Sequence, residues 1–109
     1  MLNEKLRNEI VNIISTKKPY KVILFGSQAS GKQSQNSDID LLVVLNKEGI
    51  PKSYRKKSMN YLEINRLLRN INKKIPMDIM VLTKTQWEKF IELKSGFSKE
   101  IVMRGIELI

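Results

Sequence analysis

Neither cysteine nor histidine occurs in this chain of 109 residues, and their absence removes several kinds of functional site at once. Without cysteine there is no disulfide framework and no thiolate ligand for a metal. Without histidine there is no imidazole base, no Ser-His-Asp triad and none of the usual zinc ligands. Carboxylates are therefore the main candidates for acid-base chemistry or metal binding.

Long apolar runs are also missing. No stretch is long enough to span a bilayer, and the first residues, Met1 to Lys5, lack the apolar segment of a signal peptide. We therefore expect a cytoplasmic protein with no membrane association. Its length favours a single domain over residues 1–109, and a hydrophobic content of 41% with 28% charged residues is typical of a globular protein.

Negative charge is scarce: 20 basic residues stand against 11 acidic ones, a net charge of +9. The excess is concentrated between Lys52 and Lys74, where eight basic residues accompany one acid, Glu63, for a net charge of +7. A basic surface of this kind favours partners that carry phosphate or acidic groups, such as nucleotides, RNA or an acidic protein. A solvated helix face that only keeps the protein soluble explains the same charge equally well.

Hydrophobic periodicity predicts an α+β fold, a small mixed β-sheet flanked by helices. Helices are predicted at residues 2–16, 53–72, 84–93 and 97–104, and strands at 20–25, 38–45, 77–82 and, as an edge strand, 106–109. Thr83 is the predicted N-cap of the third helix. The apolar second half of the strand at 38–45 predicts a strand that is covered on both faces. Residues 26–37, which are rich in Gly, Ser, Gln and Asn, predict a loop.

Large side chains on the predicted helices and strands are expected to serve packing. Trp87, Tyr54 and Tyr61 fall on apolar helical stripes and are expected to be core or interface residues. The methionines Met59, Met80 and Met103 are expected to fill the core.

The three aspartates of the chain, Asp38, Asp40 and Asp78, all fall on predicted strands, where this residue is disfavoured. Asp38 and Asp40 are two residues apart, so they project from one face with Cα atoms about 6.6 Å apart. If the third strand pairs beside the second, Asp78 reaches the same edge. Clustered carboxylates repel one another unless a cation neutralises them, and a set of oxygen ligands selects Mg²⁺ or Mn²⁺ rather than Zn²⁺. Two such ions about 3.5–4 Å apart form the clamp used for in-line displacement at phosphorus.

Gly26 and Ser27 follow the first predicted strand. Gly26 permits a tight turn and the close approach of a phosphate, and Ser27 can donate its hydroxyl at the start of a helical turn that favours anions. Residues Gly26 to Lys32 also fit the first seven positions of a Walker A loop. We reject that alternative because Gln33, at the eighth position, lacks the hydroxyl that binds magnesium, and because so few strands cannot build a P-loop domain.

Together these residues resemble the signature of polymerase-beta-like nucleotidyltransferases, in particular the stand-alone minimal members. The resemblance rests on Gly26-Ser27, ten further residues, an Asp-Ile-Asp motif at 38–40, and Asp78 on a later strand. It covers Tyr20 to Leu82 and extends to the C-terminal segment from Arg104. It implies that Asp38 and Asp40 bind two Mg²⁺ ions, and that Asp78 binds the ion on the acceptor side and assists deprotonation of the acceptor hydroxyl. It also implies that Gly26 and Ser27 hold the β- and γ-phosphates.

The loop departs from the family at one position. Many relatives carry an arginine directly after the serine, where this chain has Gln28, and Lys32 is the nearest cation in the loop that can contact the nucleotide. This difference bears on how strongly the triphosphate is bound and leaves the predicted metal ligands intact.

Minimal members of the family are commonly made beside a HEPN-domain ribonuclease toxin, and some act as antitoxins by adding AMP to a tyrosine of that toxin. The resemblance thus implies an ATP-dependent nucleotidyltransferase in a toxin–antitoxin system. The alternative is a non-catalytic binding module that neutralises a toxin or binds RNA by contact alone. Because a minimal core has no second domain to hold an acceptor, we expect a hetero-complex or a homo-oligomer.

Overall fold

The computed structural model describes residues 4–26, 29 and 38–109, which form helices on both faces of a small sheet. The helices in these ranges are α1 (Glu4–Ser15), α3 (Tyr54–Leu67), α4 (Arg69–Lys74), α5 (Lys84–Glu92) and α6 (Gly96–Arg104). The strands are β1 (Lys21–Phe25), β2 (Ile39–Leu45), β3 (Met77–Thr83) and β4 (Ile106–Glu107). The loop predicted at 26–37 lies outside the described residues except for Gly26 and Ala29.

The sheet is mixed, with the strand order β3-β2-β1-β4. Strand β2 runs parallel to β3, whereas β1 runs antiparallel to both β2 and β4. The predicted α+β class with a mixed sheet is therefore confirmed. The antiparallel pairing of β1 with β2 is unlike the βαβ unit that carries a P-loop, which supports the rejection of a Walker A site.

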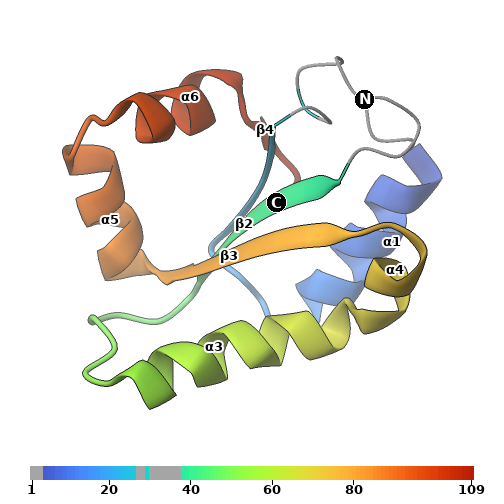
Figure 1. The fold of residues 1–109 in the computed structure, drawn as a ribbon, viewed down its shortest axis with the longest axis horizontal. Helices are drawn as coiled ribbons and strands as arrows, with labels where there is room; N and C mark the ends of the chain where they lie inside the picture. The colour runs from blue at the N-terminus through green and yellow to red at the C-terminus, as the bar shows by residue number, and fades with distance from the viewer. Residues whose placement is uncertain (1–3, 27–28, 30–37) are drawn as a thin grey trace.

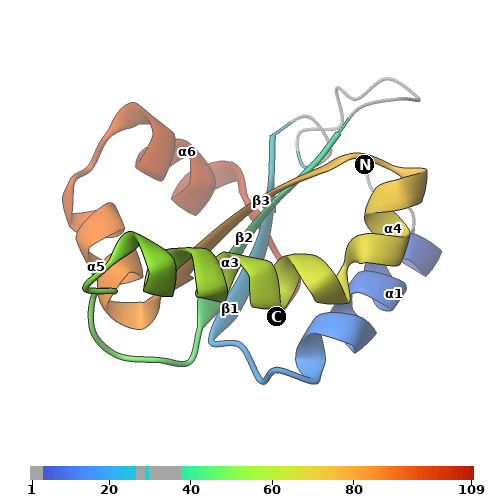
Figure 2. The same cartoon turned by 60° about the horizontal axis from the view of Figure 1, so that its bottom comes forward.

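The helices and the sheet form three layers (Figure 1). Helices α1, α3 and α4 cover one face of the sheet and α5 and α6 cover the other, as the second view also shows (Figure 2). Because side chains alternate along a strand, β2 contributes to two cores. Leu41 and Val43 pack with Ile64 of α3, whereas Leu42 and Val44 pack with the helices of the opposite layer. Strand β2 is thus covered on both faces, as predicted.

The long helix predicted at 53–72 is interrupted at Leu68. This residue has φ −95° and ψ 6°, ends α3, and precedes the short helix α4. Its side chain is fully buried, so the interruption lets the chain turn while an apolar anchor stays in the core. Beyond α4, the Met77 backbone N–H donates to the Asn72 side-chain oxygen at 3.0 Å, which joins the end of this segment to β3.

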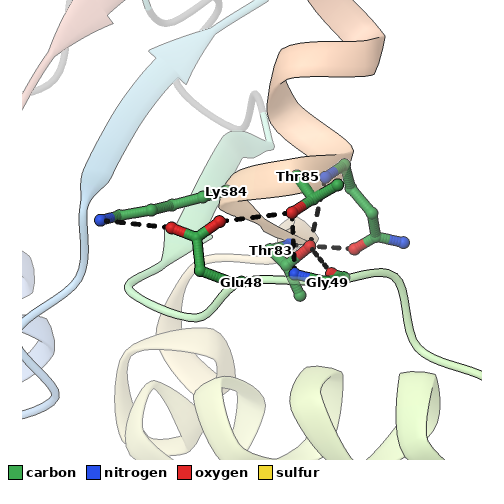
Figure 3. Close-up of polar contacts among 6 residues, drawn as sticks. Glu48, Gly49, Thr83, Lys84 and Thr85 are labelled. Carbon is green, nitrogen blue, oxygen red and sulfur yellow. Dashed lines mark hydrogen bonds and ion pairs between the residues drawn. The ribbon is translucent and has the colours of Figure 1, made fainter.

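The start of α5 fixes the neighbouring loop (Figure 3). Thr83 is its N-cap, as predicted, and forms a capping box with Gln86. The Thr83 hydroxyl also donates to the Gly49 carbonyl oxygen at 2.6 Å, and the Gly49 N–H donates to the Thr85 hydroxyl at 2.7 Å. These bonds tie the loop after β2 to the junction between β3 and α5.

Several predictions about large side chains need correction. Trp87 is buried as expected, but Tyr54 is 86% exposed and Tyr61 is 40% exposed, so the core is excluded for both and the interface role stays a prediction. Met59 and Met103 are also exposed, so neither fills the core as expected. Of the helices in the described ranges, none has the length and hydrophobicity needed to cross a membrane.

Candidate functional site

Two of the three aspartates are direct neighbours in the sheet. Asp40 of β2 and Asp78 of β3 are register partners in the parallel ladder, so their side chains leave the same face side by side. Along β2, Asp40 alternates with the residues that face α1 and α3, and therefore lies on the layer side of α5 and α6. Asp38 does not belong to the strand, contrary to the prediction, because β2 begins at Ile39. The Asp38 side chain is exposed at the entry to β2.

The pKa of the Asp40 carboxyl is affected by the two other aspartates. Burial raises the pKa of Asp40 above its ordinary value, and the negative charges of Asp78 and Asp38 raise it further. A hydrogen bond between Asp40 and Asp78 acts in the same direction. Because neighbouring negative charges repel one another, this position favours a bound positive charge.

Gly26 lies against the same carboxyl. It ends β1 with φ +74°, a left-handed conformation that favours glycine, and an ideal Cβ at this position would stand 2.2 Å from Asp40 Oδ2. Phe25, the residue before it, is the register partner of Asp40 in the antiparallel pair. Gly26 therefore brings an unobstructed stretch of main chain directly beside Asp40.

The other two predicted nucleotide contacts, Ser27 and Lys32, lie outside the described residues, as does Gln28. The first residue described after this loop is Asp38. Both ends of the loop therefore reach the Asp40 region, one through Gly26 and the other through Asp38.

The carboxylate oxygens are the type of ligand that a hard divalent cation prefers, but the residues that the structure describes do not gather three carboxylates around one position. Asp38 is close enough to Asp40 to affect it electrostatically, yet in the described part of the chain no three His, Cys, Asp or Glu side chains gather closely enough to hold one metal ion. The carboxyls offer only oxygen ligands, and the repulsion between them is the kind that Mg²⁺ or Mn²⁺ relieves. Asp40 and Asp78 are the two that are placed side by side to hold such an ion, whereas Asp38 lies at the entry to β2.

A row of aromatic rings, which the sequence did not reveal as a unit, holds α5 and α6 beside this face. Phe97 of α6 contacts Phe25 of β1 edge to face at 5.6 Å and Phe90 of α5 at 5.7 Å between ring centroids. Phe90 stacks on Trp87 at 5.9 Å. Phe25 lies far from the other three rings in sequence, so no local pattern predicts its contact with Phe97.

The basic segment from Lys52 to Lys74 does not border the aspartates. It forms α3 and α4, which pack on the face of the sheet opposite to Asp40 (Figure 2). The helices that carry this basic surface therefore lie across the sheet from the carboxyl pair.

Comparison with known proteins agrees with this arrangement. The family model described as polymerase beta, nucleotidyltransferase matches residues 8–109. None of the curated proteins compared with the chain matched it in sequence. Among solved structures, a toxin–antitoxin complex with AMP-PNP has 19% sequence identity and a TM-score of 0.56, over 94% of this chain and 72% of that one.

A second similar structure is a mutant of the toxin–antitoxin pair MntA–HpeT, in which two aspartates two positions apart are changed to glutamate. It has 17% identity and a TM-score of 0.53, over 99% of this chain and 73% of that one. At these identities the likeness concerns the fold, whereas the family model spans nearly the whole sequence. The chain therefore belongs to the polymerase beta nucleotidyltransferase family.

Proposed function

We propose that this protein is a magnesium-dependent, single-domain nucleotidyltransferase that transfers AMP from ATP to a hydroxyl group, and that it acts in the cytoplasm as an antitoxin. The proposed acceptor is a tyrosine of a HEPN-domain toxin. The observation that carries the proposal is the placement of Asp40 and Asp78 side by side as register partners of β2 and β3, with Asp38 at the entry to β2. Paired carboxyls destabilise a fold, so their presence at one sheet edge favours a catalytic role over a structural one.

In the proposed reaction the acceptor oxygen forms a bond to the α-phosphorus of ATP. The bond from that phosphorus to the oxygen bridging the β-phosphate breaks, and pyrophosphate leaves. Asp78 accepts the proton of the acceptor hydroxyl. Asp40 and Asp78, with Asp38 moving in as a third ligand, would hold magnesium, which would supply positive charge to the triphosphate and to the attacking oxygen.

The remaining proposed roles concern the polyphosphate. Gly26 has no side chain beside Asp40, which leaves room for phosphate oxygens near the main chain. Ser27 and Lys32 are proposed to contact the β- and γ-phosphates, as the family resemblance implies.

The similar solved structures support this proposal in three respects. One contains AMP-PNP, an analogue of ATP, and both are toxin–antitoxin complexes. In the other, the two mutated aspartates have the same spacing as Asp38 and Asp40. An ATP-using antitoxin is therefore the function that we assign to the present chain.

The direct test is a transfer assay with ATP labelled at the α-phosphate, magnesium and the product of the adjacent gene. The wild-type protein should label that partner, and Asp40→Asn or Asp78→Asn should each reduce labelling roughly a hundredfold or more. Glu9→Gln, which changes an exposed acid on α1, is the matched control and should label normally.

A second measurement separates metal binding from chemistry. Magnesium should raise the Tm of the wild type and of Glu9→Gln but not that of Asp78→Asn. If the wild type inhibits its partner without labelling it, the protein is a binding module and the enzymatic proposal fails.

A further inference from the structure

A groove runs along α3 on the side of the sheet opposite to Asp40. Two cavities, of about 370 Å³ and about 500 Å³, share Lys47, Met59 and Asn60 in their walls, so they form one continuous depression. We call it the α3 groove. On the helix it extends from Lys56 to Leu67, which is about 16 Å at the rise of an α-helix.

The floor of the α3 groove is apolar and exposed. Met59 is 61% exposed, Leu62 is 42% exposed and Ile50, at the loop end, is 48% exposed. Met59 and Leu62 are three residues apart, so they follow one another along a single face of α3. Covering such side chains removes apolar surface from water, at about 25 cal/mol per Å². A face of this composition fits an amphipathic partner better than it fits bulk solvent.

The walls of the groove are basic. Five basic residues and two acids line the two cavities. In the described part of the chain, no carboxylate pairs with Lys52, Lys56 or Arg66. These three side chains therefore offer positive charge that a partner can neutralise.

The two acids in the walls are already engaged. Lys17 and Lys47 share one carboxylate, Glu63, at 3.0 Å and 3.7 Å. The hydrogen bond from Lys17 lowers the pKa of Glu63 below its ordinary value; burial opposes this effect, and the charge of Lys47 adds to it. Glu48 faces Lys84 at 3.9 Å. The unpaired charge of the groove is therefore positive.

One wall is fixed before any partner arrives. The loop from Lys47 to Pro51 is tied by the hydrogen bonds of Gly49 with Thr83 and Thr85 (Figure 3). The Lys84 backbone N–H also donates to the Lys47 carbonyl at 2.9 Å. A wall held in this way loses little conformational freedom on binding.

The composition of the α3 groove distinguishes among three possible partners: RNA, a second copy of this chain and an acidic protein segment. Single-stranded RNA is bound by basic surfaces with aromatic side chains on which bases stack, but no aromatic residue lines either cavity. The exposed Tyr54 and Tyr61 of α3 lie outside the groove. A second copy of this chain carries a net charge of +9 and would be repelled. An acidic protein segment with an apolar face matches both the walls and the floor.

We propose that the α3 groove binds an acidic, amphipathic helix of about three turns from a partner protein. The groove lies on the opposite face of the sheet from Asp40, so this contact holds the partner without bringing its acceptor hydroxyl to the aspartates. The proposal requires no catalysis and stands whether or not the protein transfers a nucleotide.

Binding of labelled peptides to the full chain tests the proposal by fluorescence anisotropy. The probe is a synthetic amphipathic helix of leucine and glutamate, compared with the same peptide carrying lysine for glutamate and with a single-stranded oligoribonucleotide. The acidic peptide should bind, and Lys52→Glu/Lys56→Glu should weaken it at least about tenfold, since two favourable charge contacts become repulsive. Met59→Ser should weaken it about threefold through the lost apolar contact.

The matched control is Lys73→Glu/Lys74→Glu, which changes the net charge equally on α4, outside the groove. It should change the affinity less than about twofold at physiological salt. Equal losses in the two charge variants mean that binding is non-specific. That result, the absence of peptide binding, or oligoribonucleotide binding that only the groove variant abolishes would overturn the proposal.

Discussion

At the scale of single residues, two glycines with similar backbones have different surroundings. Gly26 has φ +74° and Gly49 has φ +87°, but an added Cβ would meet Asp40 Oδ2 at 2.2 Å in the first case and nothing within 4 Å in the second. Replacing either by alanine should destabilise the fold by about 1–2 kcal/mol through left-handed strain. Gly26→Ala should also displace the Asp40 carboxyl and reduce nucleotide transfer at least about tenfold.

Urea unfolding and the transfer assay measure the two effects separately. Gly49→Ala should unfold at lower urea concentration and retain its activity. If Gly26→Ala were equally active, the Asp40 carboxyl would have no role that depends on its position, and the proposed site would have to be abandoned.

The aspartates show which parts of the candidate site the sequence could predict. Their rarity and strand positions predicted that Asp40 and Asp78 would meet, and the parallel register confirms it. The sequence could not show that the pair shares a hydrogen bond or that Asp38 stands outside the strand, because both depend on where pairing begins. Nor could it show the contact of Gly26 with Asp40, since that contact crosses two strands.

At the scale of secondary-structure elements, Gly105 determines how α6 ends. An ideal Cβ there would stand 2.4 Å from the Ile101 carbonyl oxygen and 2.6 Å from a methyl carbon of Ile23, whereas at Gly96, at the start of α6, nothing lies within 4 Å. Gly105→Ala should therefore destabilise the protein by about 1–3 kcal/mol, because a backbone oxygen cannot move aside without shifting the helix.

The matched change, Gly96→Ala, should be neutral or stabilise by up to about 1 kcal/mol, because it restricts only the unfolded chain. The comparison of the two midpoints in urea checks this expectation. Equal urea midpoints for the two variants would mean that α6 can shift over β1 at no cost, and that the close approach of residue 105 to Ile23 does not affect stability.

Elements were predicted well where a local cap or a breaker marks their ends. Thr83 caps α5 as the sequence indicated, and α6 ends at residue 104, the predicted bound. The interruption at Leu68 escaped prediction because Leu68 and its neighbours are good helix formers, and the turn there is imposed by packing against the sheet. Met59 was expected in the core but is exposed, because Ile64 is the one residue of α3 that is buried.

At the scale of the whole molecule, the sheet separates the carboxyl pair from the α3 groove. The carboxyl pair lies on the α5 and α6 side, and the α3 groove lies on the other. The groove draws Lys17 from the end of α1 and Lys47 from the loop after β2, so the basic run at 52–74 alone could not define it. Only the tertiary fold brings these lysines to α3.

Glu63 of α3 joins the end of α1 to the loop after β2 through its two ion pairs. It pairs with Lys17 and Lys47 while its side chain remains 34% exposed, so Glu63→Gln should lower the free energy of unfolding by only about 0.5–1 kcal/mol at pH 7. Because the pKa of Glu63 is lowered in the folded state, its stabilising effect is present above pH 4.5 and is lost as the pH falls below that value. Urea titrations should show the two proteins converging in acid.

The same change should strengthen the α3 groove. Removing this carboxylate frees two lysines in its wall, so the acidic peptide should bind Glu63→Gln about threefold or more tightly at low salt. Glu92→Gln, an exposed change on α5 away from the groove, should alter neither stability nor binding. A Glu63 variant that is less stable yet binds no better would show that the two lysines serve the fold alone, whereas a gain in affinity with a loss of stability indicates that this ion pair limits an interaction surface.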